Sequence, residues 1–428
     1  MKVIEMKCIL VSLVLLASSA ARAETPPAEG TSLPLDEAVS LAIRDNAGLK
    51  SLRAKWEAMQ EQPAQAQALP NPMFTYSGMD AASGGTWPNT DEKRFMVQQE
   101  LPWIGKRGLR EGIAVQNAEI MRLELETMTR EVVMEVKESY FDLVAVRQVI
   151  EIMQQEEAVI RRIEKVAETQ YGTGERTQAD VLSAQTELTM LKQKLLDYQA
   201  QENTLQAKLN TLLNRRADSP LIVARPPVDA GPDKSPADLF ALAATNRPEI
   251  LAAQAQIKRY EMEKKLMAKE SVPDYKLGVE YRNIGASEDM VMFSIGIDLP
   301  IWRSKVGAGV READKMQESS LAARENAEQR SAMDVQDASF KLQTARRTLD
   351  LYRTELIPQA EARFNASEAG YRTGKVDFMD LLESERALLG AKMMAAMAEG
   401  AVGMQAAQLE RATGIPSSGN GAMEGERK

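Results

Sequence analysis

The 428-residue sequence contains no histidine, one cysteine and few aromatic side chains. The cysteine, Cys8, lies inside an N-terminal apolar run, away from the rest of the chain. The usual general base, zinc ligands and thiol nucleophile are therefore missing, and only carboxylates, lysines and hydroxyls remain as catalytic groups. We expect no enzyme activity and no cofactor. The net charge of -9 also disfavours nucleic acid as a partner, because an acidic protein repels phosphates.

The N-terminus has the organisation of a secretory signal peptide. Lys2 and Lys7 precede the apolar run 9–17, and Ala21-Arg-Ala23 has the small-x-small form of a cleavage site. The alternative, a membrane-spanning anchor, needs about 20 apolar residues, roughly twice the length of this run. The sequence therefore predicts a signal peptide over 1–23. No later run of 18 apolar residues follows, so a mature chain that enters a membrane would do so as β-strands.

The chain repeats itself with a period of about 200 residues, far longer than the unit of a solenoid. Tyr171-Gly-Thr-Gly174 recurs as Tyr371-Arg-Thr-Gly374, and Glu100-Leu-Pro-Trp103 matches Asp298-Leu-Pro-Ile301. This echo indicates an internal duplication with two equivalent halves. The predicted organisation is a first repeat over 24–230, a second repeat over 231–413 and a flexible C-terminal tail over 414–428.

Hydrophobic periodicity predicts long helices in both halves. Val132, Val146, Met153 and Ile160 lie on a seven-residue grid, which is the coiled-coil period. Each long helix ends at a Tyr-x-Thr-Gly turn, where glycine can adopt the left-handed conformation that stops a helix, and a second helix returns. The expected helices cover about 35–62, 109–170, 177–213, 236–269, 306–369 and 377–413. Sixty helical residues extend roughly 90 Å, so the molecule must be elongated.

Alternation with a period of two predicts two β-hairpins, one in each half. Tyr275, Leu277 and Val279 alternate with polar residues, and the segments around Phe293 and Phe74 repeat this pattern. The predicted strands cover about 72–79, 93–101, 274–284 and 289–299. The alternative is a small sheet packed on protein, but helices with narrow heptad seams offer little apolar surface to cover it. Because a transmembrane barrel needs about eight strands or more, four strands predict a homo-oligomer.

Four motifs carry a resemblance to a known family. They are Leu35-Asp-Glu-Ala-Val-Ser-Leu-Ala42, Leu101-Pro-Trp-Ile-Gly-Lys106, Leu356-Ile-Pro-Gln-Ala-Glu361 and Asp380-Leu-Leu-Glu383. With the order of helices and strands, they resemble the outer membrane efflux protein family, the TolC-like channel-tunnels, over nearly all of the mature chain. The Leu-Pro-Trp-Ile-Gly-Lys segment looks more like the heavy-metal cation branch of that family than like its drug branch.

The resemblance implies a mainly α fold with a small β part. Long antiparallel coiled-coil hairpins would form an α-barrel tunnel in the periplasm, and four strands per chain would complete a trimeric 12-stranded β-barrel in the outer membrane of a Gram-negative cell. The implied partners are two further copies of the chain, outer membrane lipid, a periplasmic adaptor (membrane fusion protein) and an inner-membrane pump of the RND type. The implied function is passive conduction of substrates that the pump and adaptor hand over, with metal cations as one candidate cargo.

The resemblance also assigns candidate sites at the periplasmic end. Asp380 and Glu383 match a ring of carboxylates that narrows the mouth of the tunnel, although charges in a first helical turn also serve the helix dipole alone. The first half has Asp180 but Ser183, so only one carboxylate is duplicated. The tips of the hairpins are the expected contacts with the adaptor, although turn chemistry alone also explains their glycines. The tip residues are Tyr171, Gly172, Thr173, Gly174, Tyr371, Arg372, Thr373 and Gly374.

Methionine is frequent, with 23 residues in the chain. Most are expected to fill the core, as at Met393, Met394 and Met397. The strand register, however, places five of them on the polar face of the sheet: Met73, Met79, Met96, Met290 and Met292. Thioethers are soft ligands that suit monovalent copper, so these residues are weak metal-ligand candidates along a conducting path.

Other functions require different sequences. A periplasmic adaptor would carry a single coiled-coil hairpin flanked by β-rich domains, whereas two hairpins and two alternating strand pairs are expected here. A structural coiled-coil tether would not need strands that alternate between apolar and polar residues. Both remain alternatives to a channel at this point.

Overall fold

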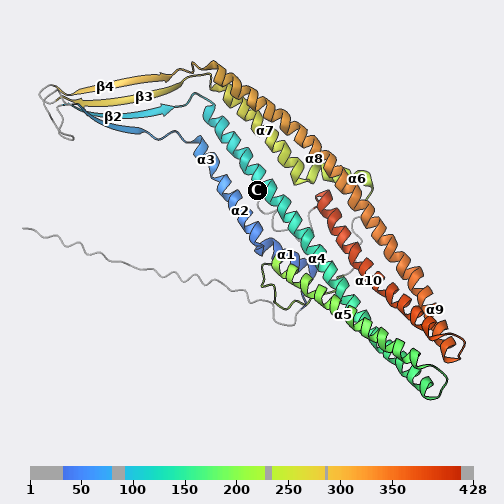
Figure 1. Ribbon diagram of the computed structural model, residues 1–428. Coiled ribbons are helices and arrows are strands. Elements are labelled where there is room, and N and C mark those ends of the chain that lie inside the picture. Colours follow the sequence, from blue (N-terminus) through green and yellow to red (C-terminus); the bar gives the residue numbers. More distant parts are fainter. Residues whose placement is uncertain (1–31, 80–91, 227–233, 285–287, 416–428) are drawn as a thin grey trace, which may run out of the picture.

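The computed structural model describes residues 32–79, 92–226, 234–284 and 288–415. The expected signal peptide over 1–23, with Cys8, and nearly all of the expected tail lie outside these residues. The molecule is elongated, with a sheet at one end and two helical hairpins at the other (Figure 1). As the heptad pattern predicts, no compact domain encloses the long helices.

The sheet contains four antiparallel strands in the order β1-β2-β3-β4, and it projects beyond the helices (Figure 1). The strands are β1 (Met73–Met79), β2 (Glu92–Leu101), β3 (Asp274–Asn283) and β4 (Met290–Asp298). Their register aligns Phe74, Val97, Val279 and Phe293 in one cross-strand row. Phe293 is 81% exposed and Phe74 is 65% exposed. The apolar face is therefore not packed on protein within this chain, which contradicts the small-sheet alternative.

The first half supplies the longest element of the molecule. Helix α4 (Lys106–Gly172) has 67 residues, and α5 (Gln178–Leu212) returns antiparallel to it. Val132, Val146 and Ile160 of the predicted heptad seam are all buried. A seam of this kind buries a narrow apolar stripe along the whole helix instead of one central core. The core is accordingly spread over several clusters along the helix contacts.

The second half differs because its long helix is interrupted. Helix α8 (Arg303–Leu351) passes through a π-helical turn, η1 (Tyr352–Leu356), into α9 (Ile357–Arg372), and α10 (Phe378–Thr413) returns. The sequence predicts one continuous helix here. Pro358 explains the difference, because it lacks an N–H and its ring clashes with the carbonyl four residues earlier. A π-turn accommodates that lost hydrogen bond without ending the rod.

The shorter helices are also broken where continuous helices are expected. The first half has α1 (Leu35–Asp45), α2 (Ala47–Gln60) and α3 (Gln62–Gln67), and the second has α6 (Pro236–Asn246) and α7 (Pro248–Lys269). Asn46 separates α1 from α2, because its side chain accepts hydrogen bonds from the N–H groups of Gly48 and Leu49. Pro248 begins α7, as proline does at a first helical position.

These pieces build a layer of helices in which α4, and α8 continued by η1 and α9, run from the sheet to the tips (Figure 1). Near the sheet, α4 packs against α2, α3 and α7, while near the tips it packs against α5 and α10. Helix α8 likewise packs against α7 and then against α10. Short helices stacked end to end thus continue the returning helices toward the sheet. The arrangement positions two hairpin tips at one end of the rod and two β-hairpins at the other.

Candidate functional site

The hairpin tips are two copies of one turn. Gly174 has φ 77° and Gly374 has φ 75°, which is the left-handed region that the sequence predicts for these glycines. The N–H of Glu175 donates to the carbonyl of Gln170 at 2.9 Å, and Lys375 donates to Gly370 at 2.8 Å. The backbone therefore makes the same bond at the same offset in both turns. The geometry of the turn therefore explains why the same glycine recurs at Gly174 and Gly374.

The two tips contact each other through a residue that sequence reasoning missed. The Arg176 guanidinium of the first tip lies over the Tyr371 ring of the second, 4.8 Å from its centroid, and donates to the carbonyl of Val376 at 3.3 Å. Tyr371 also packs on Phe378, with ring centroids 5.4 Å apart. It is consequently buried, whereas its counterpart Tyr171 is 48% exposed. The other predicted tip residues, Gly172, Thr173, Gly174, Arg372, Thr373 and Gly374, are exposed.

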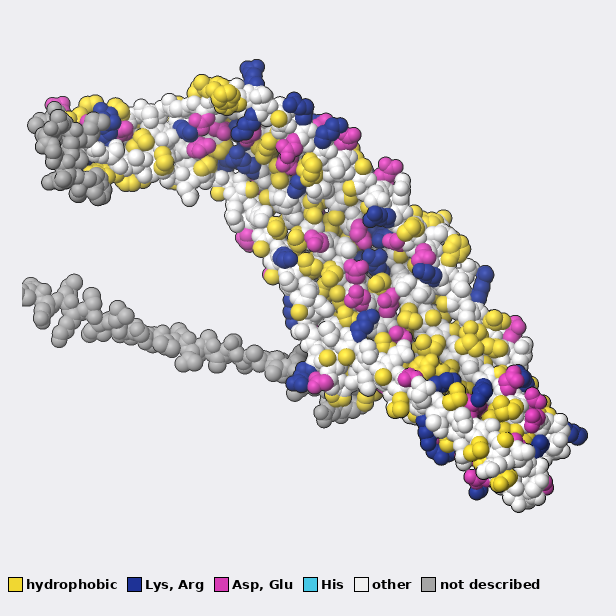
Figure 2. All heavy atoms as spheres, in the orientation of Figure 1, with side chains coloured by type: hydrophobic (Ala, Val, Ile, Leu, Met, Phe, Trp, Pro, Cys, Tyr) yellow, Lys and Arg dark blue, Asp and Glu magenta, His cyan; other side chains and the backbone are white. Residues whose placement is uncertain are grey.

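Asp380 and Glu383 lie in the first turns of α10, both exposed. The Glu383 carboxylate is 3.4 Å from the guanidinium of Arg363 on α9. In the first half, Asp180 instead accepts a hydrogen bond from the Thr177 hydroxyl at 3.0 Å, as residues near a helix N-terminus commonly do. Figure 2 shows acidic and basic side chains mixed around this end of the molecule. Asp380 and Glu383 therefore both lie on the surface of the single chain.

Three buried glutamates lie between the hairpins, and the sequence reading missed them. Glu156 of α4 and Glu187 of α5 are each 5% exposed, and Glu385 of α10 is fully buried. Burial, together with the neighbouring Glu156 carboxylate, raises the pKa of Glu385 from 4.5 to about 8. A signal was present, because Glu385 falls three residues after Leu382 and four before Leu389, on the apolar spacing of its helix.

The methionines on the sheet share its polar face as the register predicts, but they do not converge. Met96 and Met292 lie in one cross-strand row with Glu280 between them, and Met290 is paired with Arg282. Strands are about 4.8 Å apart, so two thioethers separated by a third strand cannot share one ion. Met73 lies diagonally from Met96 on the neighbouring strand. The side chain of Met79 lies outside the described residues.

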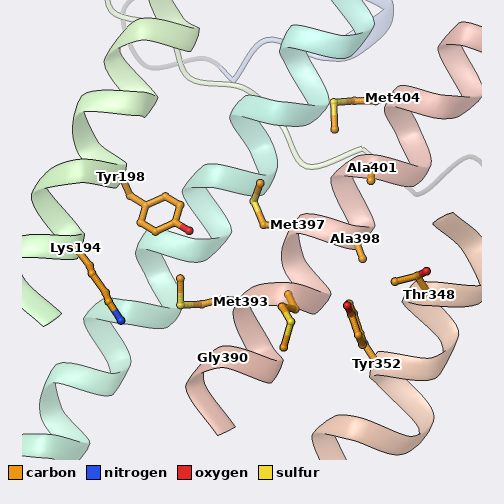
Figure 3. Close-up of a pocket in the computed structure, with 11 residues that line it drawn as sticks. Lys194, Tyr198, Thr348, Tyr352, Gly390, Met393, Met397, Ala398, Ala401 and Met404 are labelled. Atoms are coloured by element: carbon orange, nitrogen blue, oxygen red, sulfur yellow. The ribbon is translucent and has the colours of Figure 1, made fainter. Parts of the chain in front are cut away.

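A cavity of about 650 Å³ lies farther along the helices and is lined by α5, α8, η1 and α10 (Figure 3). Tyr198 of α5 and Tyr352 of η1 point into it from either side, and Met393, Met394 and Met397 of α10 also line it. The prediction that these methionines fill the core is wrong for Met394, which is 44% exposed. Helix α10 turns its small residues toward α4 and leaves this face open.

The Leu101-Pro-Trp-Ile-Gly-Lys106 motif joins the sheet to α4. Lys106 is 1% exposed, and its ammonium donates to the Asp274 carboxylate and to the carbonyl of Val272, each at 3.0 Å. The N–H of Trp103 donates to the same carboxylate at 2.6 Å. Gly105 has φ 89° beside Lys269, a conformation that L side chains rarely adopt. The motif thus fixes the first hairpin to the start of β3 through a buried ion pair.

Neither a metal cluster nor an independent membrane helix stands out in the described ranges. No group of three or more histidine, cysteine, aspartate or glutamate side chains there could hold a metal ion. Helix α10 is long and apolar enough to cross a membrane by composition, with a mean hydropathy of 1.2 over its best window. Half of that window is buried against other helices, which is typical of a core helix. Its packing against α4 and α8 favours that interpretation.

Comparison with known proteins agrees with this geometry. The family model described as "Outer membrane efflux protein" matches residues 38–215 and 239–415. The chain is 24% identical over 366 residues to the cobalt-zinc-cadmium resistance protein CzcC of Cupriavidus metallidurans, covering 84% of this chain and 85% of that protein. It is 23% identical over 333 residues to the pyoverdine export outer membrane protein OpmQ of Pseudomonas putida, covering 73% and 68% respectively.

Among solved structures, the fold is similar to that of CusC, described in work on conformational changes that accompany folding and transmembrane channel formation. The TM-score is 0.77 at 18% identity, and the match covers 89% of this chain and 92% of CusC. The likeness extends over the sheet and both hairpins at once, because so little of either chain is left unmatched. The adaptor and tether alternatives predict other folds and are not favoured.

Proposed function

This chain belongs to the outer membrane efflux protein family, and on that premise we propose that it forms a homotrimeric channel for metal cations. The chain is an efflux channel of the outer membrane with a helical periplasmic extension. The observation that carries the finer part is the likeness to the cobalt-zinc-cadmium resistance protein over most of both chains. Passage, not catalysis, is the activity we infer.

The edges and the exposed apolar face of the sheet support a trimer. Among the described residues, β1 and β4 each pair with one neighbouring strand, so the outer edge of each is positioned to pair with another chain. Every residue of β4 is exposed, including Ile295 at 79%. Three copies would pair these edges and close a barrel of twelve strands, with the row of Phe74 and Phe293 toward lipid. Light scattering of the detergent-solubilised protein should give three chains; a stable monomer would contradict this part.

The tips support docking to a periplasmic adaptor, which in turn would connect to an inner-membrane pump of the RND type. Their exposed backbone turns lie at the end of the molecule farthest from the sheet (Figure 1). Because Tyr371 is buried, we propose that Tyr171, Arg372 and Thr373 provide the side-chain contacts. Replacing Arg372 and Thr373 with alanine should weaken cross-linking to the adaptor, whereas replacing the exposed Lys192 on the flank of α5 should not.

Asp380 and Glu383 are proposed to narrow the mouth of the tunnel. Two carboxylates from each of three chains would make a ring that attracts cations and lowers anion entry. Asp380→Asn with Glu383→Gln should reduce the preference of the channel for cations over anions in planar bilayers. A reversal potential that stays unchanged in a salt gradient would remove this role.

The cargo is tested by tolerance to metals. A deletion strain should lose tolerance to cobalt, zinc or cadmium salts and regain it with the intact gene. The likeness to the pyoverdine export protein favours a second candidate, export of an organic siderophore, and would be supported if siderophore secretion fell while metal tolerance did not. Replacing Met73, Met96, Met290 and Met292 together by leucine tests the weaker soft-ligand path: unchanged copper tolerance would exclude it.

A further inference from the structure

The buried glutamates lie at the junction of three helices that belong to different halves. Glu156 and Glu187 come from the α4 and α5 hairpin, and Glu385 comes from α10. Their surroundings are apolar, since Ile160, Leu188 and Leu389 of the same contact are buried. Burying a carboxylate in such a place is costly unless it is paired or neutral.

One cation serves these three acids. The Arg386 guanidinium donates to the Glu187 carboxylate, with Nε at 2.7 Å, and thereby pairs with it. Glu385 and Glu156 are left facing each other with no cation of their own in the described part of the chain. If Glu385 and Glu156 are both ionised, neither carboxylate oxygen of Glu385 has a hydrogen-bond partner among the described residues. A proton on Glu385 resolves this, because the resulting hydroxyl can donate to Glu156.

The pKa of Glu385, about 8 through burial and the nearby Glu156 and Glu187 charges, agrees with that assignment. At neutral pH the carboxyl is therefore protonated in this packing. Losing the proton would leave two ionised groups opposed in an apolar contact between α4 and α10. Water must then enter or the helices must separate.

We propose that the proton between Glu385 and Glu156 is a latch that holds α10 against α4 and keeps the mouth of the channel closed. The latch lies five residues beyond Asp380, about 7.5 Å along the helix, so separation there displaces the mouth itself. This inference rests on the proposed channel and is separate from the proposed constriction, because Asp380 and Glu383 are on the surface and the latch is inside. Its function is control of opening, not selectivity.

The coupling between proton release and channel opening determines how the open probability depends on pH. In the closed state Glu385 keeps its proton up to about pH 8, while in an open, hydrated state its pKa returns toward 4.5. Between these values, opening releases one proton. The ratio of open to closed channels should then rise about tenfold per pH unit, and it should level off above about pH 8.

The test is the open probability of single trimeric channels in planar bilayers from pH 5.5 to 9. The intact channel should show the rise and the plateau. Glu385→Gln keeps the hydrogen bond but cannot ionise, so its open probability should be independent of pH and low. The double variant Glu385→Leu with Glu156→Leu, which removes both facing acids, should also be flat. Glu361→Gln, an exposed acid on α9, is the matched control and should retain the full slope.

A double variant at the surface carboxylates tests the constriction separately from the latch. Asp380→Asn with Glu383→Gln should change ion preference and leave the slope with pH intact. If that double variant changes nothing while Glu385→Gln is flat, the constriction fails and the latch stands. The latch is overturned if the intact channel has no slope between pH 6 and 8, or if Glu385→Gln retains it.

Discussion

The two hairpin tips share a turn but differ in what surrounds it. In the first half, Tyr171 is 48% exposed, while Tyr371 at the matching position of the second half is 1% exposed. The glycines that follow them have almost the same φ. Duplication therefore preserved the backbone and allowed the side chains to diverge once the two copies lay next to each other.

The largest effect should come from truncating the buried tyrosine. Tyr371→Ala removes a ring packed against Arg176 and Phe378 and should cost about 3–5 kcal/mol. Tyr171→Ala should change the unfolding free energy by less than about 0.5 kcal/mol. Chemical unfolding followed by circular dichroism measures both. Since the Tyr371 hydroxyl is buried without a hydrogen-bond partner among the described residues, Tyr371→Phe should be neutral or stabilising. Equal losses at the two tyrosines would show that the tips are equivalent after all.

A similar contrast exists where the sheet meets the helices. Lys106→Ala leaves the Asp274 carboxylate without its buried cation and should cost about 3 kcal/mol. Ser304, at the matching position in the first turn of α8, is exposed, and its replacement by alanine should have little effect. The midpoint of chemical unfolding measures the loss of stability in both variants. Lys106→Met, which keeps the length of the side chain but not its charge, should resemble the alanine variant if charge pairing is the cause.

The third contrast concerns pH. Glu385 has a pKa raised from 4.5 to about 8 in the folded chain, so its contribution to stability is complete below about pH 4.5 and is lost as pH rises through 8. Glu385→Gln should lessen that decline by up to a few kcal/mol, an order-of-magnitude figure. The matching residue of the first half is Gln185, which is exposed. Gln185→Glu should add no pH dependence in this range, and thermal unfolding between pH 5 and 9 would reveal it if it did.

The smallest effect on stability is expected at the turn glycines, where the two halves should behave alike. Gly174→Ala and Gly374→Ala each place a Cβ in the left-handed region, with open space around it. Strain alone then acts, and each should cost about 1 kcal/mol. Their unfolding midpoints should fall by the same amount. A clear difference between the two would mean that the neighbouring tip, not the turn, determines the cost.

Periodicity predicted the long helices and the four strands because burial along a rod or a sheet repeats at a fixed interval. The breaks were missed, since the effect of Asn46, Pro248 and Pro358 depends on where neighbouring helices allow a bend. Glu385 was missed for a related reason. Its spacing placed it on the apolar seam, but only the packing of α4 and α5 shows that Glu156 and Glu187 face it. Contacts between elements distant in sequence leave little trace in the order of residues.

Helix α4 is a single unbroken rod of 67 residues, about 100 Å long, whereas its counterpart has a joint at η1. A rigid rod that pivots at its middle acts as a lever with arms of about 50 Å. A tilt of about 5° moves each end by roughly 4 Å without breaking a hydrogen bond along the helix. The jointed helix can absorb that tilt locally. We therefore expect that one continuous and one jointed helix per chain convert a small change of angle into a change in the width of the tunnel mouth.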